Sequence, residues 1–177
     1  MKCVQLNQSG QIIGVCVWPE TAAPSCWEAL TEAQAQSLPE EFVGWSLVNG
    51  VLVAPASPTA SQLLASAQTA QSALLAGGCA TSIVSGFTSS ALGSANTYPS
   101  DPTTQGNIDR AAVHGGAIWC ESSAGAWSLA QHTAAQALQV QADLWTHIQN
   151  CQSKLATLKA QVAAATTVSA VEAVVWS

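Results

Sequence analysis

Charged residues are scarce in this sequence, and basic residues are the scarcest. Four of its 177 residues are Lys or Arg and ten are Asp or Glu, which makes 8% charged; an average globular protein has roughly 25%. The four cations are dispersed along the chain, so they form no basic patch for neutralising phosphates. We therefore expect no nucleic-acid partner. The cations are Lys2, Arg110, Lys154 and Lys159.

Long apolar runs are also missing. No segment approaches the roughly 18–20 apolar residues that span a bilayer, so we expect no membrane partner. The first residues, MKCVQLNQSGQ, lack the apolar core of a secretory signal. The expectation is a protein made in the cytoplasm and either kept there or carried out on a particle.

Motifs for metal binding, nucleophilic catalysis and phosphate binding are absent. The six cysteines are widely spaced, with no C-x-x-C, and no histidine stands near them at zinc-ligand spacing. G-x-S-x-G and Gly-rich phosphate loops do not occur. We expect no metal site and no cofactor. His147 could ring the axis of a trimer, but a structural histidine explains it more simply.

One group of titratable residues lies close together in sequence: Asp101, Asp109, His114 and Glu121. General acid–base catalysis would need two of them within hydrogen-bonding reach. Asp101 is better explained as a helix cap, Asp109 as part of a solvated face and His114 as part of a helix end. We therefore predict that the protein is not an enzyme and assign no catalytic residue.

Residues 1–55 are predicted to form a small β-rich module. Ser9-Gly10 is typical of a two-residue hairpin turn, which would place Cys3 opposite Cys16. These two cysteines are then either buried free thiols or a cross-strand disulfide. A second hairpin is predicted at Asn49-Gly50. Between them, Thr31 and Gln34 fit a capping box for a helix over 32–37.

Residues 57–177 are predicted to form a mainly helical domain. A first helix would begin at Ser57-Pro58 and stop at Gly77-Gly78, with a strand within the next nine residues. Asp101 would cap a second helix that ends at Gly115-Gly116. A small Trp-containing hairpin is expected near 117–128, with residues 123–125 at its tip.

A long helix is predicted from about 129 to 165, capped by Ser128 and Gln131, because no proline or glycine interrupts it. A short helix would follow the break at 166–169. The long helix has an apolar stripe at steps of four and three, and this spacing fits two structures. One is a coiled coil with other chains; the other is burial against the two preceding helices. The stripe consists of Leu144, Ile148, Cys151, Leu155, Leu158, Val162 and Ala165.

Seven tryptophans stand out in a chain with two Phe and one Tyr. Most are expected in the core. Trp119 and Trp127 flank the predicted hairpin tip, and large aromatics there anchor interfaces or stack on sugars. We take as interface candidates Trp119, Trp127, Leu144, Ile148, Leu155, Leu158 and Val162.

The order of motifs over residues 80–177 resembles a domain of unknown function found in tail-fibre and tail-fibre-assembly proteins of tailed bacteriophages. The resemblance implies a place in the virion tail and no catalytic residues. It rests on Gly86-Phe87, Asp101, Gln105, Asn107-Ile108, Trp119, Trp127, Leu155, Leu158, Val162, Ala164 and Ala165.

Together these observations predict an α+β fold, with a small N-terminal β-hairpin unit and a mainly helical domain that has a long C-terminal helix. A surface so poor in charge favours self-association, so we expect a homo-oligomer that contacts other phage tail proteins. The expected function is a structural or adaptor component of the tail. The alternatives are a tail-fibre assembly chaperone and a glycan-binding or hydrolytic host-recognition module.

Overall fold

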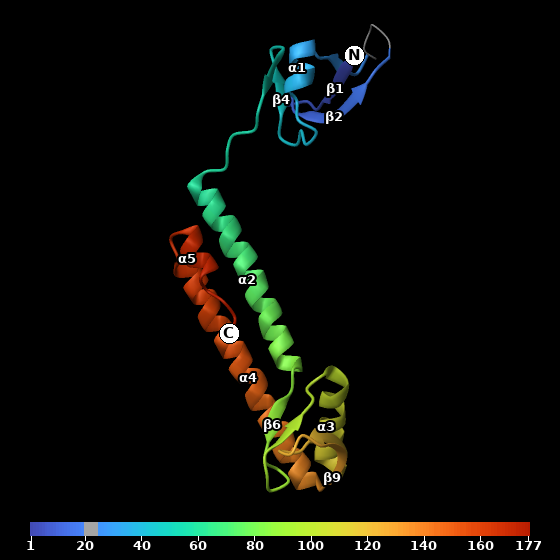
Figure 1. Cartoon of the computed structure of the whole chain (residues 1–177), viewed down its shortest axis with the longest axis vertical. Helices are drawn as coiled ribbons and strands as arrows, with labels where there is room; N and C mark the ends of the chain where they lie inside the picture. The colour runs from blue at the N-terminus through green and yellow to red at the C-terminus, as the bar shows by residue number, and fades with distance from the viewer. Residues whose placement is uncertain (20–24) are drawn as a thin grey trace. The chain divides into compact units, whose positions relative to one another are not determined.

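The computed structural model describes residues 1–19 and 25–177 and divides the chain into two units, Met1–Pro58 and Thr59–Ser177. The boundary lies within a few residues of the one predicted at 55–57. The N-terminal unit is mainly strands and the second unit mixes helices with a sheet and has a long C-terminal helix (Figure 1), so the fold class is α+β, as the sequence predicted.

The Met1–Pro58 unit contains two small sheets and one short helix. β1 (Lys2–Leu6) lies between β2 (Ile12–Val17) and β3 (Glu28–Ala29), and β4 (Ser46–Val48) pairs with β5 (Val51–Val53). The helix α1 is Glu32–Ser37. Apolar side chains from both sheets and from around the helix close a core of Val4, Ile12, Leu30 and Leu38.

The first hairpin has the predicted cross-strand register but a different turn. Asn7 pairs with Gln11, so the loop holds three residues and not two, and Gly10 takes a positive φ of 78°. A bulge between Gln5 and Leu6 then restores the register. Cys3 therefore lies opposite Cys16, as predicted, and both are free thiols. Burial and the neighbouring Cys3 raise the pKa of the Cys16 thiol.

Two other predictions for this unit are confirmed. Thr31 and Gln34 form the capping box of α1. Asn49 and Gly50 both have positive φ, 51° and 75°, which is the conformation of a type I′ hairpin turn.

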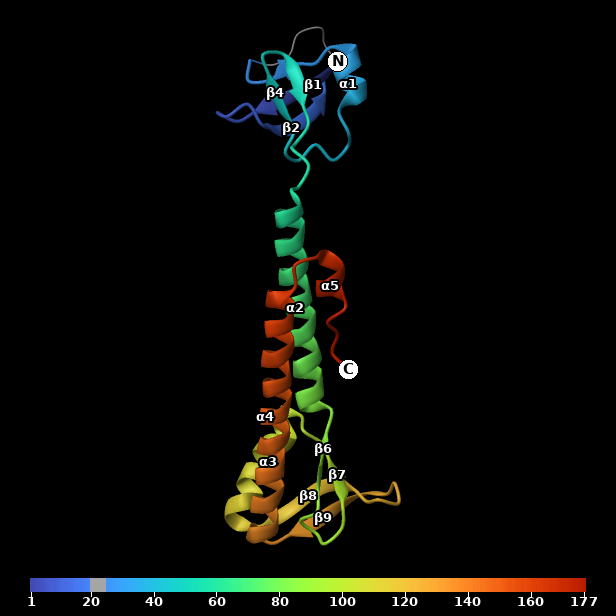
Figure 2. The ribbon, with the colours of Figure 1, turned by 90° about the vertical axis from the view of Figure 1, so that its left-hand side faces the viewer.

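The Thr59–Ser177 unit is built around two long helices that lie side by side, α2 (Ala60–Val84) and α4 (Ala134–Ala164) (Figures 1 and 2). At one end of this pair lie α3 (Pro102–His114) and a four-stranded antiparallel sheet of order β6-β7-β8-β9. Its strands are Phe87–Ser89, Asn96–Tyr98, Gly116–Glu121 and Trp127–His132. Near the other end, α5 (Val168–Glu172) packs on α2.

One face of the sheet packs on α3 and α4. Side chains at alternate strand positions point into this core, as period-2 geometry requires. They include Phe87, Tyr98, Ile118 and Cys120, which meet helix residues Ile108, Ala111, Ala137, Val140 and Leu144.

The apolar stripe of α4 packs within its own chain. Its N-terminal part joins the sheet core through Leu144 and Ile148. Its C-terminal part packs on α2 and α5, where Val162 meets Leu75 and Val171. Of the two structures that the sequence left open, burial against the neighbouring helices is therefore the one observed.

The predicted bounds of α2 were wrong at both ends. Its N-cap is Thr59, in a capping box with Gln62, and not Ser57. The helix also continues through Gly77-Gly78 over the predicted strand. Packing explains the glycine at position 78: a Cβ there would be 2.6 Å from Cγ of Trp176, so glycine allows the C-terminal segment to pack against the helix.

The start of α4 also differs from the prediction. Ser128 lies in β9, and the capping box is formed by Thr133 and Gln136. Both S-x-x-Q and T-x-x-Q fit the motif, so the pairing of β8 with β9 decides where the helix begins. The N-cap at Asp101, the end of α3 at Gly115 and the hairpin tip near Gly125 agree with the sequence prediction.

Candidate functional site

The outer face of the β8–β9 hairpin is apolar and exposed. The register places Trp119 opposite Leu129 and Glu121 opposite Trp127, all on the face of the sheet turned away from α3 and α4. Trp119, Trp127 and Leu129 are 53%, 50% and 55% exposed. The solvent-facing side of an antiparallel sheet is ordinarily polar, and this apolar surface is an exception. We call these three side chains the hairpin face.

The hairpin face borders a free sheet edge. Among the described residues, β9 is the last strand in the order β6-β7-β8-β9, and it contains no Pro, Lys, Arg, Asp or Glu; its final residue, His132, is buried. Charged or proline residues commonly protect edge strands from pairing with another chain. Figure 2 shows the hairpin projecting away from the α2–α4 pair. The hairpin therefore presents both apolar side chains and strand backbone at the surface of this unit.

The five interface candidates on α4 lie elsewhere. Leu144 and Val162 are buried, and Ile148, Leu155 and Leu158 are half-buried against residues of the same chain. Leu144 and Val162 thus have almost no surface left for another protein. The prediction of an interface along this stripe is corrected for these two residues, because α2, α3 and α5 already cover it.

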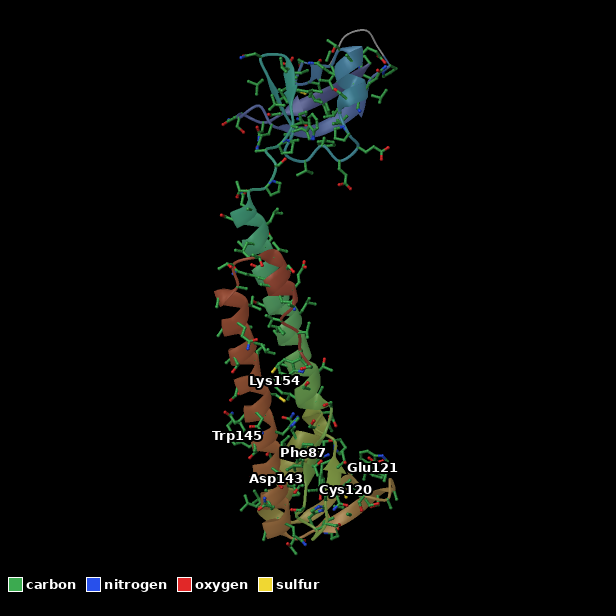
Figure 3. The ribbon with its side chains drawn as sticks, turned by 60° about the vertical axis from the view of Figure 1, so that its left-hand side comes forward. Phe87, Cys120, Glu121, Asp143, Trp145 and Lys154 are labelled. Carbon is green, nitrogen blue, oxygen red and sulfur yellow. The ribbon has the colours of Figure 1, made fainter. Side chains whose placement is uncertain are left out.

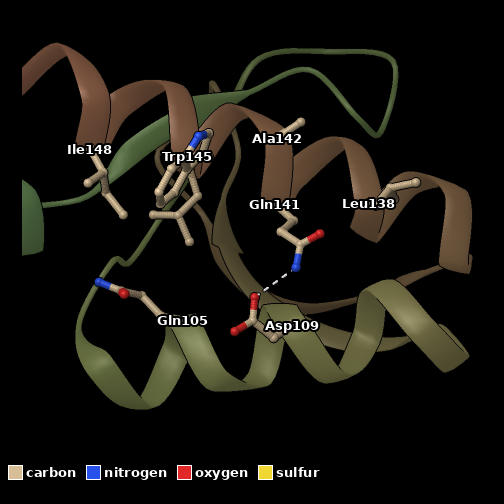
Figure 4. Close-up of a pocket in the computed structure, with 8 residues that line it drawn as sticks. Gln105, Asp109, Leu138, Gln141, Ala142, Trp145 and Ile148 are labelled. Carbon is tan, nitrogen blue, oxygen red and sulfur yellow. Dashed lines mark hydrogen bonds between the residues drawn. The ribbon is translucent and has the colours of Figure 1, made fainter.

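A second surface is a groove of about 510 Å³ between α3 and α4 (Figure 4), which we call the α3–α4 groove. Its α4 wall consists of residues at steps of three and four, which share one side of a helix. Trp145, 62% exposed, is the largest of them. The wall residues from α4 are Leu138, Gln141, Ala142, Leu144, Trp145 and Ile148.

Hydrogen bonds fix the polar side chains of the groove. Gln141 Nε2 donates to Asp109 Oδ1 over 2.8 Å, and Gln105 Nε2 donates to the Ser100 carbonyl over 2.7 Å. Each amide nitrogen thus uses one of its two hydrogens. The second amide hydrogens, the second Asp109 oxygen and the Oε1 atoms of the two glutamines are left for a ligand.

Sequence reasoning missed Leu129, Leu138 and Trp145 as surface residues. Leu138 follows the buried Ala137 and Trp145 follows the buried Leu144, and a shift of one position rotates each side chain by about 100° away from the core. An aromatic just off an apolar stripe was the available signal. The expectation that most tryptophans form the core was wrong: three are exposed and four are half-buried.

The titratable residues singled out in the sequence serve separate structural roles. Asp101 caps α3, and its hydrogen bonds from the side chain and backbone of Thr104 lower the pKa of its carboxyl group. Asp109 binds Gln141, and His114 is exposed at the end of α3. Among the described residues, no three His, Cys, Asp or Glu side chains are grouped to hold a metal ion.

His147 also has a structural partner. Its Nε2 donates to the carbonyl of Ser82 over 2.9 Å, and its ring stacks on Phe87 with centroids 6.2 Å apart. The histidine therefore links α4 to the end of α2 and to β6. Among residues 1–19 and 25–177, no helix has the length and apolar character required to cross a membrane.

Residues 66–175 match the family model of a domain of unknown function, DUF4376, and this range holds the hairpin face and the α3–α4 groove. No curated protein and no solved structure matches the chain significantly. Since the matched range is more than half of the chain, the protein belongs to the DUF4376 family.

Proposed function

We propose that the protein is a non-enzymatic structural or adaptor component of a bacteriophage tail. It is made in the host cytoplasm and built into the virion by contacts with other tail proteins and with further copies of itself. The resemblance of residues 80–177 to domains of tail-fibre and tail-fibre-assembly proteins supports the location. The scarcity of charge supports a surface covered by neighbours.

The hairpin face carries the proposal. Three large apolar side chains about half exposed, next to an unprotected edge strand, are costly to leave in water and are typical of a docking surface. The partner that fits is a weakly charged, extended segment of another tail protein. Such a segment would add to β9 through main-chain hydrogen bonds and pack its own apolar side chains on Trp119, Trp127 and Leu129.

The test is the protein composition of purified virions. A structural component stays in the finished particle, whereas an assembly chaperone binds a tail fibre and is then released. Virions assembled with a Trp119→Ser, Trp127→Ser double variant should contain much less of the protein. Trp145→Ser is the matched control, since Trp145 is as exposed and lies outside the hairpin face; it should be incorporated normally.

Two results would contradict the proposal. Absence of the wild-type protein from virions, together with binding to an isolated fibre, would support the chaperone alternative. Hydrolysis of host polysaccharide that is lost on replacing Asp101, Asp109 or Glu121 would support a hydrolytic module.

A further inference from the structure

We propose that the α3–α4 groove binds a neutral saccharide, which stacks on Trp145 and donates hydroxyl hydrogen bonds to Asp109, Gln105 and Gln141. This site is separate from the hairpin face and does not depend on the proposed tail function. Figure 4 shows the two glutamines, Asp109 and Trp145 facing the groove from α3 and α4.

The first argument is the aromatic surface. Trp145 is 62% exposed although it lies in a groove between two helices. Its indole is large and flat, with Leu138 and Ile148 on either side along α4. An aromatic ring of this kind packs on the C–H face of a pyranose ring, which is apolar, while the sugar hydroxyls point outward. Figure 3 shows Trp145 on α4.

The second argument is the polarity of the hydrogen-bonding atoms. Gln105 and Gln141 each donate one amide hydrogen, to Ser100 and to Asp109, which fixes both side chains. The groove then offers acceptors at the two Oε1 atoms and at the second Asp109 oxygen, together with the second amide hydrogen of each glutamine. A polyol matches this mixed set, because each sugar hydroxyl can both donate and accept.

The third argument is charge. Of the described residues that line the groove, none is Lys or Arg and Asp109 is the one that carries a charge. A carboxylate without a cation beside it repels phosphorylated, sulfated or uronic-acid sugars. The ligand class is therefore a neutral hexose or N-acetylhexosamine chain. A partner peptide with Lys or Arg side chains is the competing ligand, and salt dependence separates the two.

The test uses the full chain and a panel of neutral oligosaccharides: maltohexaose, cellohexaose, a mannose hexamer, a galactose hexamer and chitohexaose. Binding is followed by the indole N–H signals in two-dimensional NMR, where Trp145→Phe identifies the Trp145 signal. At least one oligosaccharide at up to about 10 mM should shift that signal, a range normal for weak single-site ligands.

Matched variants sharpen the result. Trp145→Ala should weaken binding about tenfold or more, because it removes the stacking surface. Trp145→Phe should retain part of the affinity, and Trp127→Ala, at a tryptophan that is 50% exposed but outside the groove, should leave it unchanged. Asp109→Asn removes the charge and one acceptor while its Oδ1 can still accept from Gln141, so it should weaken sugar binding by a smaller factor.

Three outcomes overturn the proposal: no binding by any member of the panel, binding unchanged in Trp145→Ala, or a shift of the Trp127 signal in its place. A lysine- or arginine-rich peptide that binds the groove, weakens with added salt and is displaced by no sugar would also overturn it. Since Trp145 is mostly exposed, its variants should unfold at the wild-type urea concentration, which excludes misfolding as the cause.

Discussion

Tyr98 donates a hydrogen bond from its hydroxyl to Nε2 of His132 over 2.9 Å, inside the core between the sheet and α3–α4. The direction follows from the other ring nitrogen. His132 Nδ1 lies 2.9 Å from the Ala130 carbonyl, which can only accept, so Nδ1 carries the proton and Nε2 accepts. Two buried polar groups on β7 and β9 thus satisfy each other across the intervening strand.

Replacing Tyr98 by Phe should destabilise the Thr59–Ser177 unit by about 1–3 kcal/mol, because His132 Nε2 then stays buried without a donor. Urea unfolding followed by circular dichroism measures this loss. His114→Gln is the control, since His114 is exposed at the end of α3 and its replacement should change stability by less than about 0.5 kcal/mol. Equal stability of Tyr98→Phe and wild type would show that the bond contributes nothing.

The same tyrosine predicts a loss of stability in strong alkali. Burial raises the pKa of Tyr98 from its ordinary value of 10.0 to about 12. Below pH 10 both the native and the unfolded chain keep the phenol proton, so the contribution of Tyr98 to the free energy of unfolding is fully present. Between pH 10 and 12 the unfolded chain releases it first, and stability falls as pH rises.

Tyr98 is the one tyrosine of the chain, so tyrosinate absorbance reports it alone. We expect its titration midpoint near pH 12 in the native protein and near pH 10 in urea. Urea titrations at pH 10 and pH 12 give the unfolding free energy at each pH. Its fall between the two should be smaller for Tyr98→Phe than for the wild type. A native midpoint near 10 would contradict the burial of this residue.

Gly77 and Gly78 form a matched pair for testing how the C-terminus packs. Trp176 packs on Gly78, its Nε1 donates to Ser82 Oγ over 2.7 Å, and the Lys154 ammonium lies 4.7 Å from its ring centroid (Figure 3 shows Lys154). A methyl group at Gly78 would displace the indole. At Gly77, a Cβ would meet no atom within 4 Å.

Gly78→Ala should therefore destabilise the protein by about 1–3 kcal/mol through overpacking. Gly77→Ala should stabilise it by up to about 1 kcal/mol, since alanine is the better helix former. Thermal unfolding of both variants gives the comparison. Two similar increases in stability would mean that Trp176 is not packed against α2.

The start of α4 can be tested in the same paired way. Thr133→Ala removes the side chain that accepts from the Gln136 backbone and should cost about 1 kcal/mol. Ser128, which the sequence equally offered as a cap, lies exposed in β9, so Ser128→Ala should have little effect. The opposite ranking in urea unfolding would place the helix start at Ser128.

Local signals in the sequence predicted much of this fold. The Thr31–Gln34 and Asp101 caps and the Asn49-Gly50 turn depend on neighbours within four residues, and all three are confirmed. The incorrect predictions concern positions whose contacts are with residues distant in sequence. Gly78 is a helix residue and not a stop, and its missing side chain leaves room for Trp176, nearly one hundred residues later.

The candidate surfaces show the same difference between local signals, which the sequence reveals, and long-range contacts, which it does not. Position beside a hairpin tip was enough to select Trp119 and Trp127, which are exposed. The stripe of α4 has one periodicity whether it meets another chain or α2 of its own chain, so the sequence left both structures open. The α3–α4 groove joins residues about 35 positions apart and had no sequence signature of its own.

Hydroxyl-radical footprinting of the tryptophans, in the free protein and in purified virions, tests most directly whether the hairpin face docks other tail proteins. We predict that Trp119 and Trp127 oxidise in the free protein and are protected in the particle, while Trp145 in its open groove oxidises in both. Equal oxidation of Trp119 and Trp127 in the two states, or absence of the protein from the particle, would contradict the account.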